Sequence, residues 1–324
     1  LMKSHKIDGF PIFKIFDSMM GVKDFLLELG DDFVVKYDGL AGGKGVKVSG
    51  EHLISHDDAL NYCNVLIKNG GKFVIEEKLV GQEFSLMSFS DGSTLKHMPV
   101  VQDHKRAYEN DEGPNTGGMG TYSDANHSLP FLNNTDIDIA KETNVKIIQA
   151  LSNEFGAKYK GILYGGFMAT KDGIKIIEYN ARFGDPESMN VLTLLQTDFL
   201  EICKAIISEE LHKMKIEFNN QATVCKYAVP EGYPTNPIKG QKIDISKIND
   251  HQKLFFGSVD QKNGDIIEAG SRTLCIVATG STIEEAEKIA EKEISKVKGP
   301  LFHRTDIGTK HLIESRIKHM QKIR

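Results

Sequence analysis

One stretch, residues 173–187, limits more than any other what this chain can fold into. It begins as a strand, because three isoleucines follow an Asp-Gly turn at 172–173. Side chains alternate between the two faces of a strand, so Glu178, Asn180 and Arg182 are expected on one face if the strand continues that far. Two oxygen ligands beside a guanidinium group suit a hard cation and the phosphate that it bridges.

The end of the same stretch predicts the start of a helix. We interpret Asp185 as the N-cap and Pro186 as the first helical residue, with the helix continuing through Leu200. A strand that leads polar side chains into a helix N-terminus is suited to bind an anion and a metal ion. The alternative is a buried strand end with a surface salt bridge, and only a nucleotide site elsewhere in the chain decides between the two.

The composition excludes several classes of protein. The 324 residues suffice for two or three domains, and a formal net charge of −5 gives no reason to expect nucleic acid or an anionic membrane as a partner. No apolar run is long enough to span a bilayer, and no signal peptide is visible. The chain starts with Leu1 in what looks like the middle of a fold, so we expect a fragment of a longer protein. Four scattered cysteines argue against a zinc site or a disulfide framework and fit a cytoplasmic protein: Cys63, Cys203, Cys225 and Cys275.

A glycine-rich loop at 38–45 joins two short predicted strands, 33–36 and 46–48. It is not a Walker A loop, because Lys44 is followed by glycine, and no dinucleotide fingerprint opens a helix here. Glycines still let backbone amides approach an anion closely, and lysines add charge. The alternative is an ordinary hairpin with a solvated tip. The candidate phosphate-binding residues are Lys36, Gly42, Gly43, Lys44 and Gly45.

A predicted strand at 72–80 and the strand after it, 83–90, suggest where a purine base binds. A strand that leaves its sheet presents backbone N–H and C=O groups beside apolar side chains, and such groups read an adenine edge. Glu83 lies just beyond the turn and is placed to accept hydrogen bonds from ribose hydroxyls. A charged surface strand is the alternative. The candidate adenine-binding residues are Glu76, Glu77, Lys78 and Leu79.

Residues 98–122 form a second polar centre. Four glycines, one proline and few apolar residues between 113 and 121 predict a long structured loop, and long loops in compact domains are usually functional. Asp103 is suited to bind an amine, and Lys105 or Arg106 a phosphate or a carboxylate. The neighbouring His104 is assigned no catalytic role.

The remaining pattern alternates helices with strands up to about residue 220. Helices are predicted at 19–29, 57–67 and 145–155, and a strand at 163–170. Residues 126–135 are assigned to a polar loop. Beyond residue 220 the turn-rich texture predicts a separate small α+β domain, with strands at 224–229 and 274–278 and one clear helix. This helix starts after Thr282, which forms a T-x-x-E capping box with Glu285.

Together these stretches closely resemble the glycinamide ribonucleotide synthetases, or phosphoribosylamine–glycine ligases, of the ATP-grasp superfamily. The run Arg-Phe-Gly-Asp-Pro-Glu-Ser-Met at 182–189 is similar to the signature of that family. Gln-Asp-His-Lys-Arg at 102–106, Gly-Pro-Asn-Thr-Gly-Gly-Met-Gly at 113–120 and the 38–45 loop match in order and spacing. The short runs 270–272 and 303–308 resemble the C-terminal domain of the family, so the resemblance covers nearly the whole chain.

The resemblance implies an α+β ATP-grasp fold, made of a core and a mobile lid, followed by a small α+β C-terminal domain. The implied boundaries are 1–16 and 87–220 for the core, 17–86 for the lid and 221–324 for the C-terminal domain. It also implies a two-step ligation, in which the carboxylate of glycine attacks the γ-phosphate of ATP to give glycyl phosphate. The amine of 5-phosphoribosylamine then displaces phosphate, and the product is glycinamide ribonucleotide in de novo purine biosynthesis.

Carried over position by position, the resemblance assigns roles to the candidate residues. Lys36 and the glycine-rich loop contact the phosphates of ATP, residues 76–79 hold adenine, and Glu83 holds the ribose. Glu178 and Asn180 hold Mg²⁺ or Mn²⁺, and Arg182 acts with Lys36 to neutralise charge during phosphoryl transfer. The residues implied to face glycine and 5-phosphoribosylamine are Asp103, Lys105, Arg106, Asn115, Thr116, Gly117, Gly118 and Asp185.

The chain departs from the family pattern at its start. Full-length relatives carry an N-terminal α/β domain that helps to bind 5-phosphoribosylamine, and a lysine ahead of the position of Leu1 that contacts ATP. The missing domain is therefore an expected partner, and a truncated ATP-binding module without full ligase activity is the first alternative. The second is another ATP-grasp carboxylate–amine ligase, such as a carboxylase subunit, against which the motifs at 113–120 and 182–189 argue.

Overall fold

The computed structural model describes residues 1–39, 45–249 and 253–324, and it divides into two compact units. One unit is residues 9–80, and the other comprises residues 1–8 and 81–324. Each unit has its own hydrophobic clusters of buried side chains. The domain boundaries implied by the resemblance remain a prediction.

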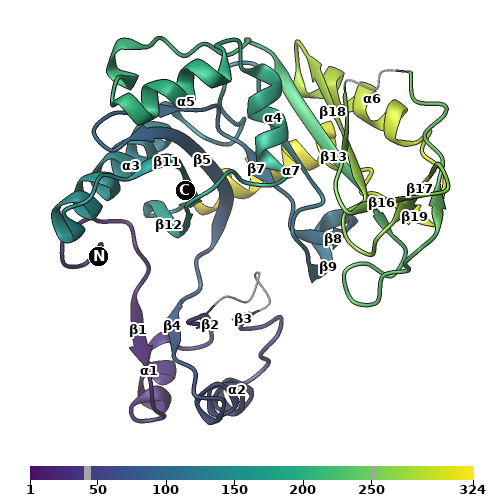
Figure 1. The fold of residues 1–324 in the computed structure, drawn as a ribbon. Coiled ribbons are helices and arrows are strands. Elements are labelled where there is room, and N and C mark those ends of the chain that lie inside the picture. Colours follow the sequence, from purple (N-terminus) through teal and green to yellow (C-terminus); the bar gives the residue numbers. More distant parts are fainter. Residues whose placement is uncertain (40–44, 250–252) are drawn as a thin grey trace. The chain divides into compact units, whose positions relative to one another are not determined.

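The unit 9–80 is a four-stranded antiparallel sheet with two helices, coloured purple to blue in Figure 1. The strand order is β1-β4-β2-β3, so β1 and β3 lie at the edges of the sheet. The elements are β1 (Phe13–Phe16), α1 (Val22–Leu29), β2 (Phe33–Tyr37), β3 (Val46–Val48), α2 (His56–Lys68) and β4 (Phe73–Glu77).

Local sequence signals account for the two helices of this unit. The first helix, α1, stops at Gly30, which has the positive φ of 69° that glycine adopts without strain. The second, α2, begins with a capping box between Ser55 and Asp58, each side chain accepting from the backbone N–H of the other. Both helices bury apolar side chains in one cluster with the sheet, including the fully buried Phe73 and Val35.

The predicted strand–loop–strand around the glycine-rich segment is present as the β2–β3 pair, in which Lys36 lies opposite Val46. The expected phosphate-binding residues Gly42, Gly43 and Lys44 lie outside the described residues.

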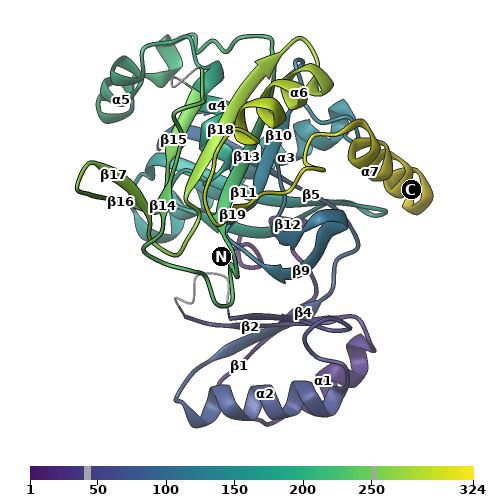
Figure 2. The same ribbon diagram turned by 90° about the vertical axis from the view of Figure 1, so that its right-hand side faces the viewer.

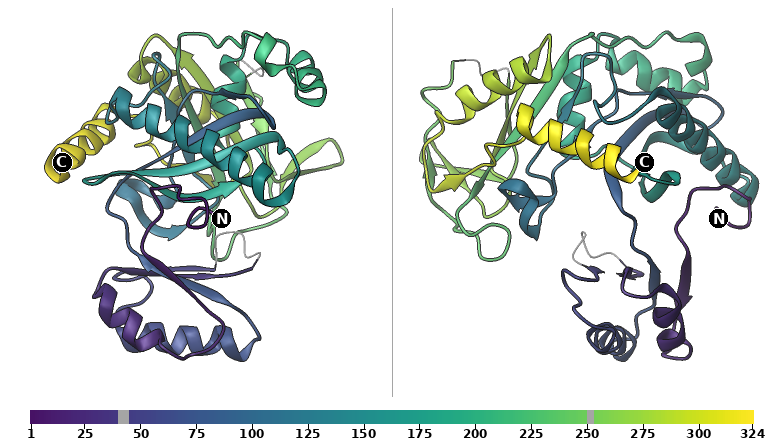
Figure 3. Two further views of the ribbon diagram at one scale, coloured as in Figure 1. Left: turned by 90° about the vertical axis from the view of Figure 1, so that its left-hand side faces the viewer. Right: turned by 180° about the vertical axis from the view of Figure 1, so that it is seen from behind.

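The larger unit contains a four-stranded antiparallel sheet of order β12-β11-β5-β6. Its strands are β5 (Gly81–Asp91), β6 (Leu95–His97), β11 (Lys160–Thr170) and β12 (Gly173–Asn180). Because side chains alternate along β5, Leu86 lies in one cluster with Ala140 and Met320, whereas its neighbour Met87 lies in another with Ile202. One face is therefore covered by α3 (Asn134–Phe155) and α7 (Lys310–Ile323), and the other by α5 (Phe199–Ser208). Figure 3 shows α7 in yellow leading to the C-terminus.

A second sheet in this unit has the order β15-β18-β13-β10-β7, with β19 paired to β13. Figure 2 shows β18, β13 and β10 side by side. Because β10 precedes and β13 follows the implied boundary at 220/221, this sheet joins the implied core to the implied C-terminal domain. Its strands are β7 (Gln102–Asp103), β10 (Gly120–Ser123), β13 (Ala222–Pro230), β15 (Leu254–Phe256), β18 (Leu274–Gly280) and β19 (Leu301–Phe302).

The helix predicted after Thr282 is present as α6 (Ile283–Ile294) and packs on this second sheet. Thr282 caps it by accepting from the N–H of Glu285 at 3.2 Å. The expected return bond to Thr282 is replaced, because the Glu285 carboxylate accepts from the backbone and hydroxyl of Ser281 at 2.8 and 2.6 Å. The helix buries one apolar stripe: Ile283, Ala286, Ala290 and Ile294.

The helix predicted from Asp185 through Leu200 is wrong in both its cap and its length. The structure has α4 (Glu187–Leu194) after Pro186, and no side chain caps it. At Leu195 the backbone turns extended, and the next N–H donates to Glu217 instead of continuing the helix. A new cap at Asp198, which accepts from the N–H of Glu201 at 3.0 Å, then starts α5.

Two further expectations also need correction. The long loop expected between 113 and 121 is shorter, because strands occupy both of its ends. The stretch 98–122 contains β7, β10 and an intervening hairpin of β8 (Arg106–Tyr108), a 3₁₀ turn (Glu109–Asp111) and β9 (Glu112–Asn115). The helix expected at 145–155 begins earlier, at Asn134, with a capping box between Asn133 and Asp136 inside the segment assigned to a loop.

The remaining described elements of the larger unit are one small sheet and a 3₁₀ turn. A three-stranded sheet has the order β14-β17-β16, from β14 (Lys242–Ile243), β16 (Val259–Lys262) and β17 (Asp265–Glu268). A 3₁₀ turn, η2 (Leu211–Lys213), follows α5. Among the helices that the structure describes, none is long and apolar enough to cross a membrane.

Candidate functional site

Asp103, at the end of β7, and Lys105 just after it lie beside Glu83 of β5. The Lys105 ammonium forms an ion pair with the Glu83 carboxylate. Burial by itself would lower the pKa of Lys105, but the charges of Glu83 and Asp103 outweigh burial and raise it. Lys105 is therefore held in its charged form beside Glu83, with 36% of its side chain exposed. The Glu83 carboxylate is paired with this lysine, and its contact with a ribose stays a prediction.

The Asp103 carboxyl lies in an unusually acidic setting. Loss of solvation and the nearby charge of Glu187 raise the pKa of Asp103 well above its usual value, although Lys105 acts in the opposite direction. Its Oδ1 accepts from the N–H of His104 at 2.8 Å. Burial likewise raises the pKa of Glu187, whose Oε1 accepts from the hydroxyl of Tyr164 at 2.7 Å. Both carboxyl groups are therefore protonated more readily than an exposed carboxyl group.

The predicted substrate loop, residues 115–118, is anchored next to Asp103. The N–H and hydroxyl of Thr116 both donate to the carbonyl of Lys105, at 2.7 and 2.9 Å. Gly118 has a φ of +115°, and a Cβ there would stand 2.7 Å from Asp103 Oδ1 and 2.5 Å from Pro186 Cδ. Only glycine fits, because the loop passes this close to two other segments. Asn115, at the end of β9, is exposed.

Asp185, which was expected to cap a helix, instead receives donors from the C-terminal part of the chain. Its Oδ1 accepts from the Tyr227 hydroxyl at 2.9 Å, and its Oδ2 forms an ion pair with Arg272 at 3.0 Å. Arg272 also donates to the carbonyl oxygens of Gly117 and Asp185, at 2.8 Å each. The segments around 103, 117 and 185 are therefore held together at one place.

The predicted metal ligands lie next to each other on β12. The side-chain amide of Asn180 donates to Glu178 Oε1 at 3.0 Å, which places both side chains on one face of the strand. Glu178 adds to the charges that raise the pKa of Lys105. The strand ends at Asn180, so Arg182 lies beyond it and its guanidinium donates to the carbonyl of Phe183 at 2.9 Å. The condition under which Arg182 would share this face is not met.

The donor set fits Mg²⁺ in kind. A carboxylate and an amide oxygen are ligands that Mg²⁺ accepts, and this ion usually keeps waters and binds substrate phosphates through only one or two protein oxygens. Across residues 1–39, 45–249 and 253–324, no group of three or more His, Cys, Asp and Glu side chains forms a self-sufficient metal site.

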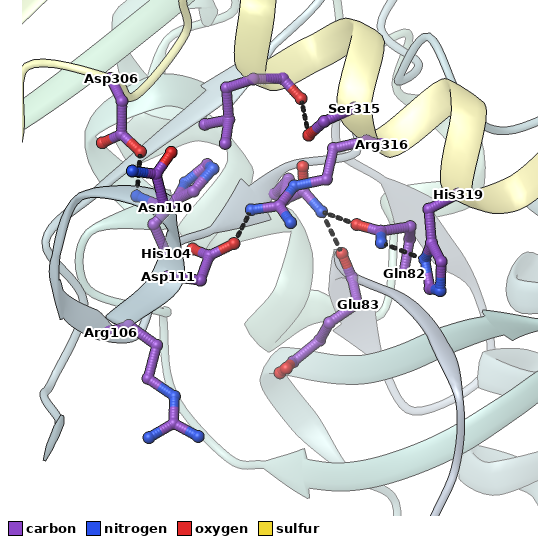
Figure 4. A network of polar contacts seen from close by, with 12 residues as sticks. Gln82, Glu83, His104, Arg106, Asn110, Asp111, Asp306, Ser315, Arg316 and His319 are labelled. Atoms are coloured by element: carbon purple, nitrogen blue, oxygen red, sulfur yellow. Dashed lines mark hydrogen bonds and ion pairs between the residues drawn. The ribbon is translucent and has the colours of Figure 1, made fainter. Parts of the chain in front are cut away.

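The β8–β9 hairpin, which carries Arg106 and Asn115, is fastened from the C-terminal part of the chain. Arg304, 1% exposed, donates to Asp111 at 3.0 Å and to the carbonyl of Arg106 at 3.1 Å. Arg316 of α7 reaches the other oxygen of Asp111, and Figure 4 shows this pair. In the same view the Arg106 side chain points away from the cluster, and it donates to the carbonyl of Gly113 at 2.9 Å.

His104 lies inside this network as a neutral ring. Burial, together with the charges of Arg316 and Arg304, lowers the pKa of His104 to about 3. Its Nδ1 pairs with the carbonyl of Gly120 at 3.1 Å. His104 is therefore a buried, packed residue, and the absence of a catalytic role stays a prediction.

The candidate nucleotide residues of the unit 9–80 form their own contacts. Lys36 on β2 makes an ion pair with Glu76 on β4. Burial raises the pKa of Glu76, and the charge of Lys36 opposes this rise. The backbone N–H groups of Glu77 and Lys78 already donate within the unit, at 2.9 and 3.0 Å. These two N–H groups are therefore already used within the unit, and the contact of this segment with adenine stays a prediction.

Two more of these residues are tied to the backbone of the same unit. The Lys78 ammonium donates to the carbonyl of Ser49 at 2.9 Å. The carbonyl of Gly45 accepts from the N–H of Tyr37 at 3.0 Å and from the hydroxyl of Tyr62 at 3.3 Å. The last residue of the glycine-rich loop is thus fixed against β2 and α2.

Sequence reasoning did not single out four residues that the structure places in the site. Glu187 belongs to the signature run and Arg272 to the Gly-Ser-Arg run at 270–272, so both carried a signal in the family motifs. Tyr164 and Tyr227 are tyrosines in strands with strong apolar patterns, and their hydroxyl partners depend on tertiary contacts that a strand pattern does not reveal.

Comparison with known families gives matches over both parts of the chain. Residues 1–188 match the family described as phosphoribosylglycinamide synthetase, ATP-grasp (A) domain, and residues 223–310 match its C domain. A phosphoribosylamine–glycine ligase of Methanocaldococcus jannaschii is 48% identical over 334 residues, covering 100% of this chain and 75% of the relative. The ligase of Methanococcus vannielii is 50% identical over 317 residues, covering 96% and 70%.

Solved structures show the same likeness. The crystal structure of phosphoribosylamine–glycine ligase from Thermotoga maritima has a TM-score of 0.84 at 30% identity, covering 94% of this chain and 76% of that one. The biotin carboxylase domain of Hydrogenobacter thermophilus 2-oxoglutarate carboxylase, in complex with MgADP, ADP and bicarbonate, has a TM-score of 0.68 at 13% identity, covering 99% and 67%. At that identity the second likeness concerns the fold alone.

Proposed function

The chain belongs to the phosphoribosylglycinamide synthetase family, and from this premise we propose that it joins glycine to 5-phosphoribosylamine while ATP is converted to ADP and phosphate. The product is glycinamide ribonucleotide, in purine biosynthesis. The predicted family, the α+β ATP-grasp fold and the class of ATP-dependent ligase are confirmed by the relatives. The four cysteines are free thiols, which fits the proposed location in a reducing cytoplasm.

One observation of the structure carries this proposal beyond the family likeness. Three segments that lie far apart in the sequence meet at Gly118: the Asp103 carboxyl, the turn at Asp185 and Pro186, and Arg272. They place two carboxyl groups together, of which Asp185 is half-exposed, beside the Arg272 guanidinium group. Such a set suits the ammonium group of a small zwitterion, because the carboxyl oxygens accept hydrogen bonds from it.

We assign nucleotide binding to both units. In the unit 9–80, Lys36 and the loop 42–45 would contact the phosphates and residues 76–79 the adenine. In the larger unit, Glu83 would bind the ribose, with Lys105 beside it as a fixed cation. Arg182, which follows β12, would neutralise charge that develops during phosphoryl transfer.

Glu178 and Asn180 would hold Mg²⁺, or Mn²⁺, through their side-chain oxygens. The bound cation would neutralise phosphate charge. The Asn180 amide nitrogen donates to Glu178 Oε1 at 3.0 Å, which holds the two side chains on the same face of β12. Replacing Glu178 by alanine removes the charged ligand of the pair and is expected to weaken binding of Mg-ATP.

For the chemistry, we propose that glycine is activated as glycyl phosphate and that the amine of 5-phosphoribosylamine then displaces phosphate. Asp185 and the loop 115–118 would orient glycine, and Asp103 would exchange a proton with an amine. The pKa of Asp103 is raised by burial and by the charge of Glu187, and a carboxyl group with a raised pKa is a stronger base once it is ionised. Lys105 and Arg106 would attract the phosphate and carboxylate groups of the substrates.

The decisive experiment is ADP release with Mg-ATP, glycine and freshly prepared 5-phosphoribosylamine, each omitted in turn. We expect release that requires all three. Binding of Mg-ATP without glycine-dependent release would instead identify the chain as an ATP-binding module. Release that persists with a different amine acceptor would identify another carboxylate–amine ligase of the same superfamily.

A further inference from the structure

Arg272, which the structure brings in from the C-terminal part of the chain, contacts two of the predicted substrate segments at once. Its Nη1 donates to the carbonyl oxygens of Gly117 at 2.8 Å, Asp185 at 2.8 Å and Gly118 at 3.3 Å. Its Nη2 forms the ion pair with the Asp185 carboxylate at 3.0 Å. A single guanidinium group therefore ties the loop 116–118 to the turn at 185.

The surroundings of Arg272 fix its orientation. The guanidinium carbon lies 4.8 Å from the centre of the Tyr227 ring, which matches a cation–π contact. The same tyrosine donates its hydroxyl to the other oxygen of Asp185 at 2.9 Å. Only 16% of the Arg272 side chain is exposed, against 50% for Asp185. The arginine is thus occupied by contacts within the protein, whereas half of the Asp185 side chain remains exposed.

Resting on the proposed function, we propose that Arg272 and Tyr227 are positioning residues for glycine. They hold the Asp185 carboxylate, which would accept from the ammonium group of glycine, at a fixed distance from the backbone of Gly117 and Gly118. The segment at 270–272 thereby contributes to recognition of the amino acid without touching it.

This role follows from the number and direction of the contacts. The carboxylate of a residue in a turn can rotate about its side-chain bonds. Each hydrogen bond that it accepts from a charged donor restricts this rotation. Nη1 also donates to the carbonyl oxygens of Gly117 and Gly118. Arg272 therefore holds the loop 116–118 and the Asp185 carboxylate, the two sides of the proposed glycine site, in fixed positions relative to each other. Loss of a hydrogen bond to a charged group typically changes an equilibrium by tenfold or more.

The test compares three variants at the site with one control. Arg272→Ala removes all four contacts, Arg272→Lys keeps the charge but not the planar fork, and Tyr227→Phe removes only the hydroxyl. Arg324→Ala is the control, because Arg324 forms a similar two-bond ion pair with Asp136, at 2.9 and 2.7 Å, within the same unit. For each protein, kcat and the KM for glycine and for 5-phosphoribosylamine are measured, together with equilibrium binding of glycine and of Mg-ATP.

We expect Arg272→Ala to raise the KM and the dissociation constant for glycine about tenfold or more, with Mg-ATP binding within twofold of the wild type. Arg272→Lys should recover part of the loss, Tyr227→Phe should show a smaller change in the same constants, and Arg324→Ala none. An Arg272→Ala protein with unchanged glycine binding, or one that weakens Mg-ATP as much as glycine, would overturn the proposal. If that variant does not fold, the lysine and phenylalanine variants decide by the same criterion.

The two proposals can fail separately. Absence of turnover in the wild type, with all three substrates present, contradicts the proposed ligase activity. Equilibrium binding of glycine still tests the role of Arg272 in that case, because the readout does not require product formation. Wild-type glycine binding that is absent altogether would overturn the positioning role.

Discussion

Asp111 shows how one side chain links the candidate site to the C-terminal part of the chain. Its carboxylate accepts from Arg304 and from Arg316, and Arg304 also holds the carbonyl of Arg106. Burial by itself would raise the pKa of Asp111, but the two guanidinium groups outweigh burial and lower it to about 2. The carboxylate therefore stays charged through the whole physiological range and keeps the β8–β9 hairpin attached.

At this scale we predict that Asp111→Asn lowers stability in a pH-dependent way. A carboxyl with a depressed folded-state pKa stabilises the fold above its ordinary value of about 3.9, and this contribution is lost as the pH falls towards 2. After discounting for partial exposure, the variant should lose about 1–2 kcal/mol at pH 7. Its free energy of unfolding should also decline less steeply below pH 4.

Urea unfolding from pH 7 to pH 3 measures both the loss of stability at pH 7 and its dependence on pH. Asp138→Asn, whose ion pair is exposed, is the control and is expected to change little. Parallel curves for the Asp111→Asn variant and the wild type would contradict the assignment.

At the scale of elements, the sequence predicted the helices and strands that are marked by local residue patterns at their ends. The strand β12 follows an Asp-Gly turn, and the helices α1 and α6 have the expected glycine end and threonine cap. The first part of α3 escaped prediction, because three of the side chains it buries there are polar. Asp136, Thr143 and Asn144 are stabilised by specific partners, such as the carbonyl of Leu86 at 3.2 Å from Asn144, and an apolar period cannot reveal these partners.

The site was predictable to a similar degree and for a similar reason. Asp103, Gly118 and Asp185 belong to motifs whose residue types indicate chemistry, and the structure brings them together. The residues that hold these side chains in place, such as Arg272 and Tyr227, come from other sheets and segments. Those contacts depend on the pairing of β10 with β13, which no local pattern specifies.

The loop between β9 and β10 gives the prediction at this scale. In Gly118→Ala, the new Cβ would stand 2.5 Å from Pro186 Cδ and 2.7 Å from Asp103 Oδ1, so the loop or the aspartate must move. We expect the KM for glycine to rise tenfold or more, with a loss of about 1–3 kcal/mol in stability from strain. Gly161→Ala is the control, since Gly161 also has a positive φ, 140°, but nothing lies within 4 Å of its Cβ position. Equal kinetic effects in the two variants would show that backbone strain, and not the close approach, is responsible.

At the scale of the whole molecule, the two units have separate hydrophobic cores. The cluster of the unit 9–80 draws all of its buried members from residues 16–75, whereas the clusters around Leu86 and Met87 belong to the other unit. Units that share no core side chains can open independently, with local free energies below that of global unfolding. The unit proposed to bind the ATP phosphates is then able to unfold while the proposed glycine site stays folded.

We therefore predict that Phe73→Ala destabilises the unit 9–80 alone. Phe73 is fully buried and stacks on Phe16 with ring centres 5.5 Å apart, so its loss should cost about 3–5 kcal/mol. Hydrogen exchange should become faster throughout β2, β4 and α2, while β11 keeps its protection.

Phe167→Ala, the matched change in the core of the other unit, where Phe167 stacks on Phe84 at 5.5 Å, should give the opposite pattern. Because Mg-ATP would bind only the folded form of the unit 9–80, adding it should restore protection there in the Phe73→Ala variant. Equal loss of protection in both units of either variant would mean that the chain unfolds as one cooperative body.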